Sequence, residues 1–114
     1  MISEKERQNR EELFRLMREN PDLPVVAMVD EEVVPDDSFG RWLGSWGSSS
    51  IEEYFVGKER THFREKNDFD AIEEALTDGV MCYEDYENMS DEEAIFAYEH
   101  LLWVKAIVVN IDLP

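Results

Sequence analysis

The residue types that most often do chemistry are few in this chain, and they fall in different predicted elements. There is one cysteine, Cys82, and there are two histidines, His62 and His100. A nucleophilic Cys–His pair needs contact in three dimensions, which a sequence alone does not supply. The chain also contains no phosphate-binding glycine loop, no G-x-S-x-G and no H-E-x-x-H motif. We therefore predict no catalytic residue and no cofactor, and we expect local hydrogen bonding for both histidines.

Carboxylates are abundant, and one group of them has the chemistry of a hard-cation site. Asp36, Asp37, Glu52 and Glu53 would supply oxygen ligands if their two segments stacked. The group lacks the alternate-residue spacing and the glycine of a calcium loop. Solvated charges on a turn and a strand explain these residues more simply, so we predict no metal site.

The net charge of −17, from 28 acidic and 11 basic residues, is the most unusual property of the chain. Its distribution is uneven. Residues 58–66 carry four basic and two acidic residues, whereas residues 67–114 carry thirteen acidic residues and only Lys105 as a base. A field of this sign repels nucleic acid and anionic lipid and attracts basic protein surfaces. The predicted partner is therefore a basic protein surface, with no direct binding of nucleic acid or membrane. Solubility alone is the alternative explanation of the charge.

The densest part of this charge is the stretch 84–93, EDYENMSDEE, which has six acidic residues in ten. Acids steer a basic partner, and interleaved aromatic residues serve as buried anchors. The structural alternative is that acids favour a helix N-terminus and that the tyrosines pack into the core. An extreme form of the docking hypothesis is a nucleic-acid mimic, whose partner would be a nucleic-acid-binding protein. The predicted partner-binding residues are Tyr83, Glu84, Asp85, Tyr86, Glu87, Asp91 and Glu92.

Two tryptophans mark the stretch 39–56, FGRWLGSWGSSSIEEYFV. Two apolar runs flank Gly47–Ser50, which is the pattern of a β-hairpin with a longer loop. Trp42 and Trp46 would share one face of its first arm. Negative charge disfavours a stacking platform for bases there, whereas a protein hot spot is compatible with it. Because both faces carry aromatic residues, we predict that this hairpin is the packed centre, with both tryptophans in the core.

Three helices are predicted to surround this centre. The first spans 3–20, with Ser3 as its N-cap, and its polar part, 1–12, is expected to project loosely. The second follows a cap at Asn67 or Asp68 and reaches Asp78. The third begins at a Ser90–Glu93 capping box and ends near Leu102. Its predicted buried residues are Ala94, Ile95, Tyr98, Leu101 and Leu102.

The remaining apolar runs predict strands. The last of them, KAIVVNID, is uninterrupted and should be central, beside VVAMV. We therefore predict a single α+β domain over 1–114, with three helices and a mostly antiparallel sheet of five to six strands in the order α-β-β-β-β-β-α-α-β. The predicted strands are Val25–Val29, Glu32–Val34, Arg41–Trp46, Ile51–Val56, Arg60–Arg64 and Lys105–Asp112.

The chain lacks an apolar run of membrane-spanning length, and its first residues, MISEKERQNREE, have no apolar signal-peptide region. The single Cys82 fits a reducing compartment. A cytoplasmic location is therefore expected.

Three stretches, PDLPVVAMVD, EVVPDDSFGRWLGSWG and KAIVVNI, carry a resemblance to a known family. They resemble an uncharacterised family of small acidic proteins of Gram-positive bacteria, often borne by phages or other mobile elements. No activity is assigned to that family, so the resemblance implies no site residues. It favours interaction, or interference with host defence, over catalysis.

The sequence thus predicts a non-catalytic protein–protein interaction domain with an acidic, aromatic-studded surface. The alternative is a small enzyme or ligand-binding protein with a pocket between sheet and helices. A deep cavity lined by Cys82 or a histidine, with converging carboxylates, would indicate that alternative.

Overall fold

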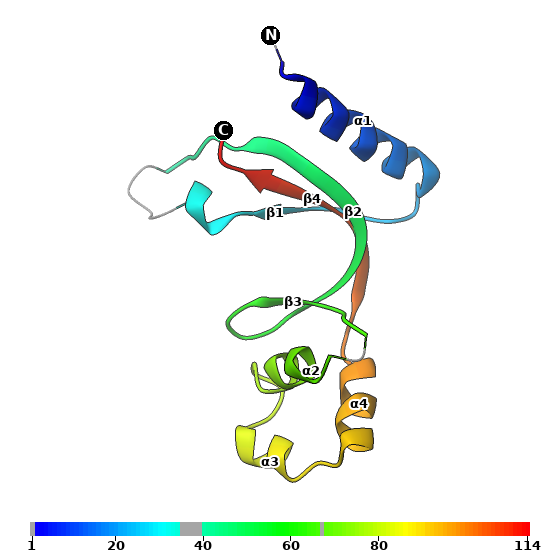
Figure 1. Cartoon of the computed structure of the whole chain (residues 1–114), viewed down its shortest axis with the longest axis vertical. Coiled ribbons are helices and arrows are strands. Elements are labelled where there is room, and N and C mark those ends of the chain that lie inside the picture. Colours follow the sequence, from blue (N-terminus) through cyan, green and yellow to red (C-terminus); the bar gives the residue numbers. More distant parts are fainter. Residues whose placement is uncertain (1, 35–39, 67) are drawn as a thin grey trace. The chain divides into compact units, whose positions relative to one another are not determined.

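The computed structural model describes residues 2–34, 40–66 and 68–114 (Figure 1). The elements in chain order are α1 (Glu4–Glu19), β1 (Val25–Val29), the 3-10 helix η1 (Glu31–Val33), β2 (Ser45–Val56), β3 (Thr61–Phe63), α2 (Phe69–Leu76), α3 (Tyr83–Glu87), α4 (Asp91–Glu99) and β4 (Val104–Asp112).

The α+β class is confirmed, but the predicted sheet and helix count are wrong. The described residues form one mixed sheet of four strands in the order β1-β4-β2-β3, together with four α-helices. β1 and β4 are parallel, from Val25 opposite Ile107 to Val29 opposite Ile111. β2 and β3 are antiparallel, with Phe55 opposite His62. The last strand lies between the first and the second, so strands that follow one another in sequence are not always neighbours.

Two segments differ from the predicted elements. The segment predicted as strand Glu32–Val34 begins as η1, since the Asp30 carboxylate accepts a hydrogen bond from the Glu32 N–H at 2.9 Å. The stretch before Ser90, for which no element was predicted, contains α3. α3 is therefore the helix that was not predicted, and it brings the number of α-helices among the described residues to four.

From Ser45 onward the predicted hairpin is instead one continuous strand, β2, and most of its predicted first arm, Arg41–Trp46, is not in a strand. Its glycine and serines do not make a turn, because they lie against β4. Asn110 donates a side-chain hydrogen bond to the Ser48 carbonyl at 3.1 Å, and a Cβ on Gly47 would lie 2.9 Å from the Asn110 carbonyl oxygen. Gly47 therefore permits a close approach of backbone. Trp46 is 44% exposed and Trp42 is half-buried, so the prediction that both lie in the core is wrong.

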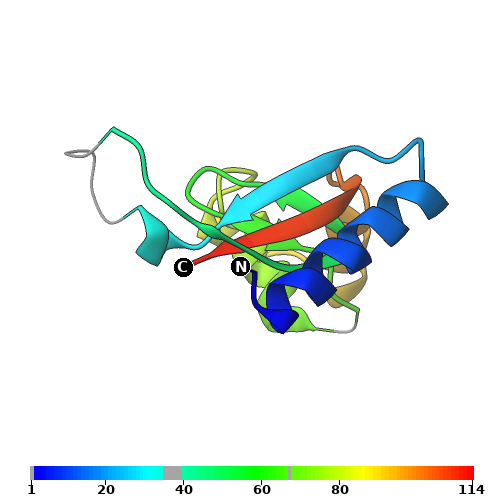
Figure 2. The ribbon, with the colours of Figure 1, turned by 90° about the horizontal axis from the view of Figure 1, so that it is seen from above.

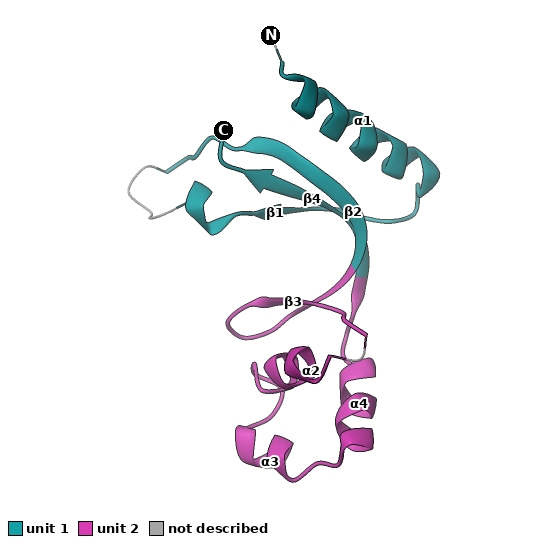
Figure 3. Cartoon of the chain, in the orientation of Figure 1, with its two compact units in different colours: residues 1–52, 105–114 teal, residues 53–104 magenta. Residues whose placement is uncertain are grey.

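The chain divides into two compact units, which are described separately (Figure 3). The first unit comprises residues 1–52 and 105–114, and the second comprises residues 53–104.

The core of the first unit lies between α1 and the sheet. The Ser3 side chain accepts a hydrogen bond from the Glu6 N–H at 3.1 Å and begins α1, as predicted. α1 runs alongside the strands of this unit (Figures 1 and 2). Its buried Leu13 and Leu16 pack with Ile107 and Val109 of β4. The predicted central place of β4, beside β1, is confirmed.

The core of the second unit lies between α2 and α4. Asp68 caps α2, whereas Asn67, the other predicted cap, lies outside the described residues. The Ser90–Glu93 capping box is present and begins α4. The buried core residues are Ile72, Ala75, Leu76, Ala94 and Tyr98.

The stripe predicted for α4 is only partly correct. Ala94 and Tyr98 are buried, but Ile95 is 42% exposed, and Leu102 is exposed beyond the helix end. No helix among the described residues has both the length and the apolar character to cross a membrane.

Candidate functional site

The residues considered for catalysis each have separate surroundings. Cys82 is exposed at the N-cap of α3. His100 is exposed at the end of α4, where its ring stacks on Phe96 with centroids 4.0 Å apart. His62 is buried in β3, and its Nε2 lies 2.7 Å from an Asp78 carboxylate oxygen. This arrangement offers no nucleophile with an adjacent base.

Metal binding also finds no support in the described part of the chain. No cluster of three or more His, Cys, Asp or Glu side chains there could hold a metal ion. Two residues of the considered cation group, Asp36 and Asp37, lie outside the described residues.

Asp78 organises the β2–β3 turn. Its carboxylate accepts hydrogen bonds from the Glu59 N–H at 2.9 Å and the Arg60 N–H at 3.1 Å, besides its contact with His62. The hydrogen bond with His62, followed by the two backbone donors, lowers the pKa of the Asp78 carboxyl. The contacts of Asp78 with His62 and with the two backbone N–H groups therefore stabilise the turn.

The predicted partner-binding residues lie on α3 and the first turn of α4, in the second unit. From residue 68 to residue 99 the chain has twelve acidic residues and neither lysine nor arginine. The five acidic members of the predicted set are all exposed. The structure thus presents this charge to solvent.

The two tyrosines of the set have different environments. Tyr83 is exposed, and its hydroxyl pairs with Glu87; this hydrogen bond, and then the charges of Glu87 and Glu73, raise the pKa of Tyr83. Tyr86 is half-buried against the core of the second unit, and burial is the main cause of its raised pKa. Their ring centroids are 6.4 Å apart. Tyr83 is therefore available as an anchor, whereas Tyr86 mainly supports the helix.

Carboxylates of α2 extend this acidic surface. The negative charges of Glu73, Asp91 and Asp70 also act on the Tyr86 phenol and raise its pKa. Asp70 and Glu73 belong to α2, which ends before the acidic stretch 84–93 begins. The acidic surface therefore draws on three helices, which the sequence block did not indicate.

α4 is apolar on both of its sides. Ala94 and Tyr98 enter the core, while Ile95 and Phe96 remain 42% and 64% exposed. Phe96 lies in an open hollow that it shares with Met89, Glu92 and Glu93, among others. The outward side of α4 therefore exposes two large apolar side chains beside the carboxylates of its first turn. We call Tyr83, Glu84, Asp85, Glu87, Asp91, Glu92 and Phe96 the α3–α4 face.

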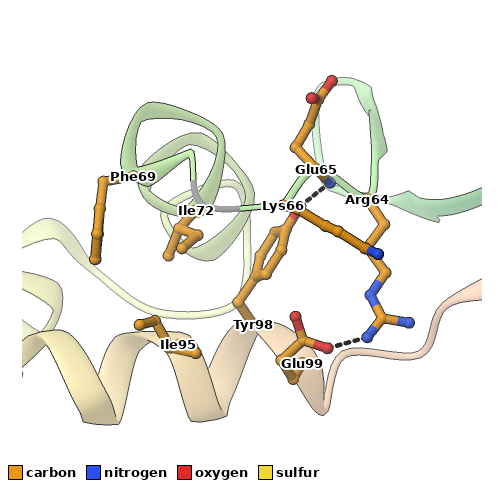
Figure 4. Close-up of a pocket in the computed structure, with 8 residues that line it drawn as sticks. All are labelled: Arg64, Glu65, Lys66, Phe69, Ile72, Ile95, Tyr98 and Glu99. Carbon is orange, nitrogen blue, oxygen red and sulfur yellow. Dashed lines mark hydrogen bonds and ion pairs between the residues drawn. The ribbon is translucent and has the colours of Figure 1, made fainter.

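A pocket of about 330 Å³ lies between α2, α4 and the segment 64–66 (Figure 4). Sequence reasoning missed it, since its residues come from segments about thirty positions apart. None of the histidines or Cys82 lines it. The eight lining residues are Arg64, Glu65, Lys66, Phe69, Ile72, Ile95, Tyr98 and Glu99.

Arg64 holds the charged end of the pocket in place. Its guanidinium donates to Glu53 at 2.8 Å and, through its other terminal nitrogen, to Glu99. These hydrogen bonds, that with Glu53 first, raise the pKa of Arg64. The guanidinium is thus committed to two carboxylates from β2 and α4.

Tyr98 forms the middle of the pocket wall. Its hydroxyl accepts a hydrogen bond from the Glu65 N–H at 2.8 Å and donates to the Phe63 carbonyl at 3.4 Å. Burial is the main cause of its raised pKa. The ring meets Trp103 edge-on, with centroids 5.0 Å apart. Packing and hydrogen bonds therefore hold the Tyr98 side chain in place, and its hydroxyl is already used.

No protein-family model, curated protein or solved structure matches this chain. The family resemblance seen in the sequence stays a prediction.

Proposed function

We propose that this protein is a non-catalytic interaction module that binds a basic protein surface through the α3–α4 face. The observation that carries the proposal is Phe96, which is 64% exposed on a helix rimmed by carboxylates. Exposed aromatic side chains are the usual anchors of protein interfaces, and a rim of one charge sign selects the opposite sign in the partner. Tyr83 offers a second aromatic side chain, already oriented by Glu87.

The charge distribution supports a basic partner over other classes. The twelve acidic residues of 68–99 are not interrupted by any lysine or arginine. Such a surface repels phosphate backbones and anionic lipid and speeds encounter with cationic proteins. A cytoplasmic location accompanies the proposal, since a single cysteine suits a reducing compartment.

A nucleic-acid mimic is a narrower form of the same proposal. In that form the carboxylates stand where phosphates would, and the partner is a nucleic-acid-binding protein. Duplex DNA should then compete with the chain for the partner, and added salt should weaken the complex steeply. If DNA and the chain bind one captured partner simultaneously, the mimic form is wrong while the broader proposal stands.

A model partner tests the proposal directly. The probe is a synthetic amphipathic helix of lysine and leucine, titrated into the isotope-labelled full chain and followed by amide chemical shifts. Phe96→Ser should weaken binding by about tenfold or more, because burying a phenylalanine is worth about 1.5–3 kcal/mol. Leu43→Ser, at an apolar residue of the first unit that is even more exposed than Phe96, should leave binding unchanged.

The charge requirement has its own matched pair. Glu84→Gln combined with Asp85→Asn should weaken binding and lower its salt dependence. Glu31→Gln combined with Glu32→Gln removes two charges from the first unit and should do neither. Equal effects of the two pairs would mean that only total charge matters, and would overturn the proposed face.

A further inference from the structure

We propose that the pocket between α2 and α4 binds a small amphipathic carboxylate, with the apolar body over Phe69, Ile72 and Ile95 and the carboxylate at Lys66. This site is independent of the α3–α4 face, since it needs no protein partner.

The pocket has an apolar end and a charged end (Figure 4). Phe69, Ile72 and Ile95 lie on one side of the Tyr98 ring, and the charged side chains of Arg64, Lys66 and Glu99 lie on the other. Ile72 is buried as a floor, while Phe69 and Ile95 are 44% and 42% exposed at the sides. An apolar surface with a few polar groups at one end is the usual composition of a small-molecule site.

The size of the pocket limits the apolar body. Its volume of about 330 Å³ is at the small end of ligand pockets, which span roughly 300–1,000 Å³. An aryl or branched alkyl acid fits this space, whereas a nucleotide or a long acyl chain does not.

The charged end selects the sign of the head group. Arg64 is already engaged by Glu53 and Glu99, so these three charges largely satisfy one another. Lys66 makes no ion pair or hydrogen bond with any described residue. The Glu65 carboxylate points away from the apolar residues (Figure 4). The Glu65 carboxylate also has no ion pair among the described residues, but because of this direction the free charge nearest the pocket is the Lys66 ammonium.

The other polar groups do not compete with Lys66 for the ligand. The Tyr98 hydroxyl is hydrogen-bonded to Glu65 N–H and to the Phe63 carbonyl. A ligand carboxylate at Lys66 would gain a charge-assisted hydrogen bond at the exposed rim of the pocket, across the Tyr98 ring from the apolar residues. An amine in the same place would meet an ammonium group and is disfavoured.

Three ligands of one shape test the sign of the head group. The full chain is titrated at neutral pH with 4-phenylbutyrate, 4-phenylbutylamine and 4-phenylbutanol, each up to about 10 mM, and followed by amide chemical shifts. The carboxylate should bind saturably, with shifts centred on residues 64–72 and 95–99, and about tenfold more tightly than the amine. Equal binding of acid and amine, or no saturable shift, would overturn the proposal.

Two matched pairs of variants locate the site. Lys66→Gln should weaken the carboxylate at least fivefold and leave the alcohol unchanged, while Lys58→Gln, at a lysine of the same unit outside the pocket, should change neither. Ile95→Ser should weaken the acid and the alcohol, while Phe96→Ser should weaken neither. Amide spectra identify any variant that fails to fold. An equal effect of the two lysine variants would remove the assignment.

The same variants separate this inference from the proposed function. Phe96→Ser should weaken the basic peptide and not phenylbutyrate, whereas Lys66→Gln should do the reverse. Each proposal can therefore fail without the other.

Discussion

The Tyr98 hydroxyl is the most informative single group to remove. Tyr98 is 1% exposed, and its ring packs in the core of the second unit. Tyr98→Phe keeps this packing and the edge contact with Trp103, but it removes the acceptor of the Glu65 N–H and the donor to Phe63. Any change in stability is then due to the hydroxyl.

The expected loss follows from these two bonds. A typical protein hydrogen bond contributes about 0.5–1.5 kcal/mol, and a buried donor left without a partner costs about 1–3 kcal/mol. Because Glu65 itself is exposed, water can reach part of the freed N–H. We therefore expect the free energy of unfolding to fall by about 1–2 kcal/mol.

Urea unfolding, followed by circular dichroism, measures this change. With a slope of about 2 kcal/mol per molar urea, the middle of the usual range, the midpoint should fall by about 0.5–1 M. Hydrogen exchange gives a local readout: protection of the Glu65 amide should drop by about tenfold or more, since a factor of ten corresponds to 1.4 kcal/mol.

The pH dependence has a definite sign. Burial raises the pKa of the Tyr98 phenol in the folded protein, so the folded state keeps a proton that the unfolded state loses. Stability is full below the ordinary tyrosine pKa of about 10 and is lost as pH rises through the folded value. Tyr98→Phe should make the alkaline loss of stability shallower.

Tyr83→Phe is the matched control. The Tyr83 side chain is exposed, and its hydroxyl is hydrogen-bonded to Glu87 at the surface. Removing this hydroxyl should therefore change the free energy of unfolding by less than about 0.5 kcal/mol. A change below about 0.3 kcal/mol in Tyr98→Phe, or equal losses in the two variants, would refute the assigned role of the Tyr98 hydroxyl.

Four further outcomes are expected. Asp78→Asn should lower the melting temperature at neutral pH and make the melting temperature fall less steeply below about pH 4. The reason is that a carboxyl whose pKa is lowered in the folded state contributes stability above its unfolded pKa, and this stability is lost as the pH falls through the folded pKa. A pH series of thermal melts checks this. Gly79→Ala should lower stability by at least about 1–2 kcal/mol, because Gly79 has φ +89° and an added Cβ would lie 2.8 Å from Lys58 Cβ; urea midpoints that match wild type would contradict the strain. Ser49→Ala should raise stability by about 1 kcal/mol, since the buried Ser49 Oγ has no hydrogen-bond partner among the described residues; a lower midpoint would indicate a partner for the hydroxyl. Added sodium chloride should raise the melting temperature, because a net charge of −17 repels itself in the compact state; a flat response would mean that the charges are already compensated.

Local interactions made the helix starts predictable. Ser3 and the Ser90–Glu93 pair cap their helices as the sequence indicated, because a cap involves residues within one turn of each other. The uninterrupted apolar run of β4 likewise indicated a central strand, because only a strand covered on both faces has so little polar surface.

The prediction of a hairpin at residues 39–56 was wrong because glycine occurs both in turns and where a neighbouring strand approaches closely. Gly47 and the serines after it are typical of turns, yet they lie within β2. The small size of Gly47 is required by the approach of Asn110 from β4, more than sixty residues away in sequence, and Asn110 also donates a hydrogen bond to the Ser48 carbonyl. No local pattern distinguishes a turn glycine from a glycine that admits a neighbouring strand.

The candidate sites show the same division. Composition alone determined that residues 68–99 are acidic and free of lysine and arginine, and the tyrosines beside the charges were visible in the sequence. Tertiary structure decided that Tyr86 supports the core while Tyr83 and Phe96 are exposed. It also brought Lys66 to the pocket of α2 and α4. Charge and caps are properties of short segments, whereas exposure and pocket walls depend on which distant segments pack together.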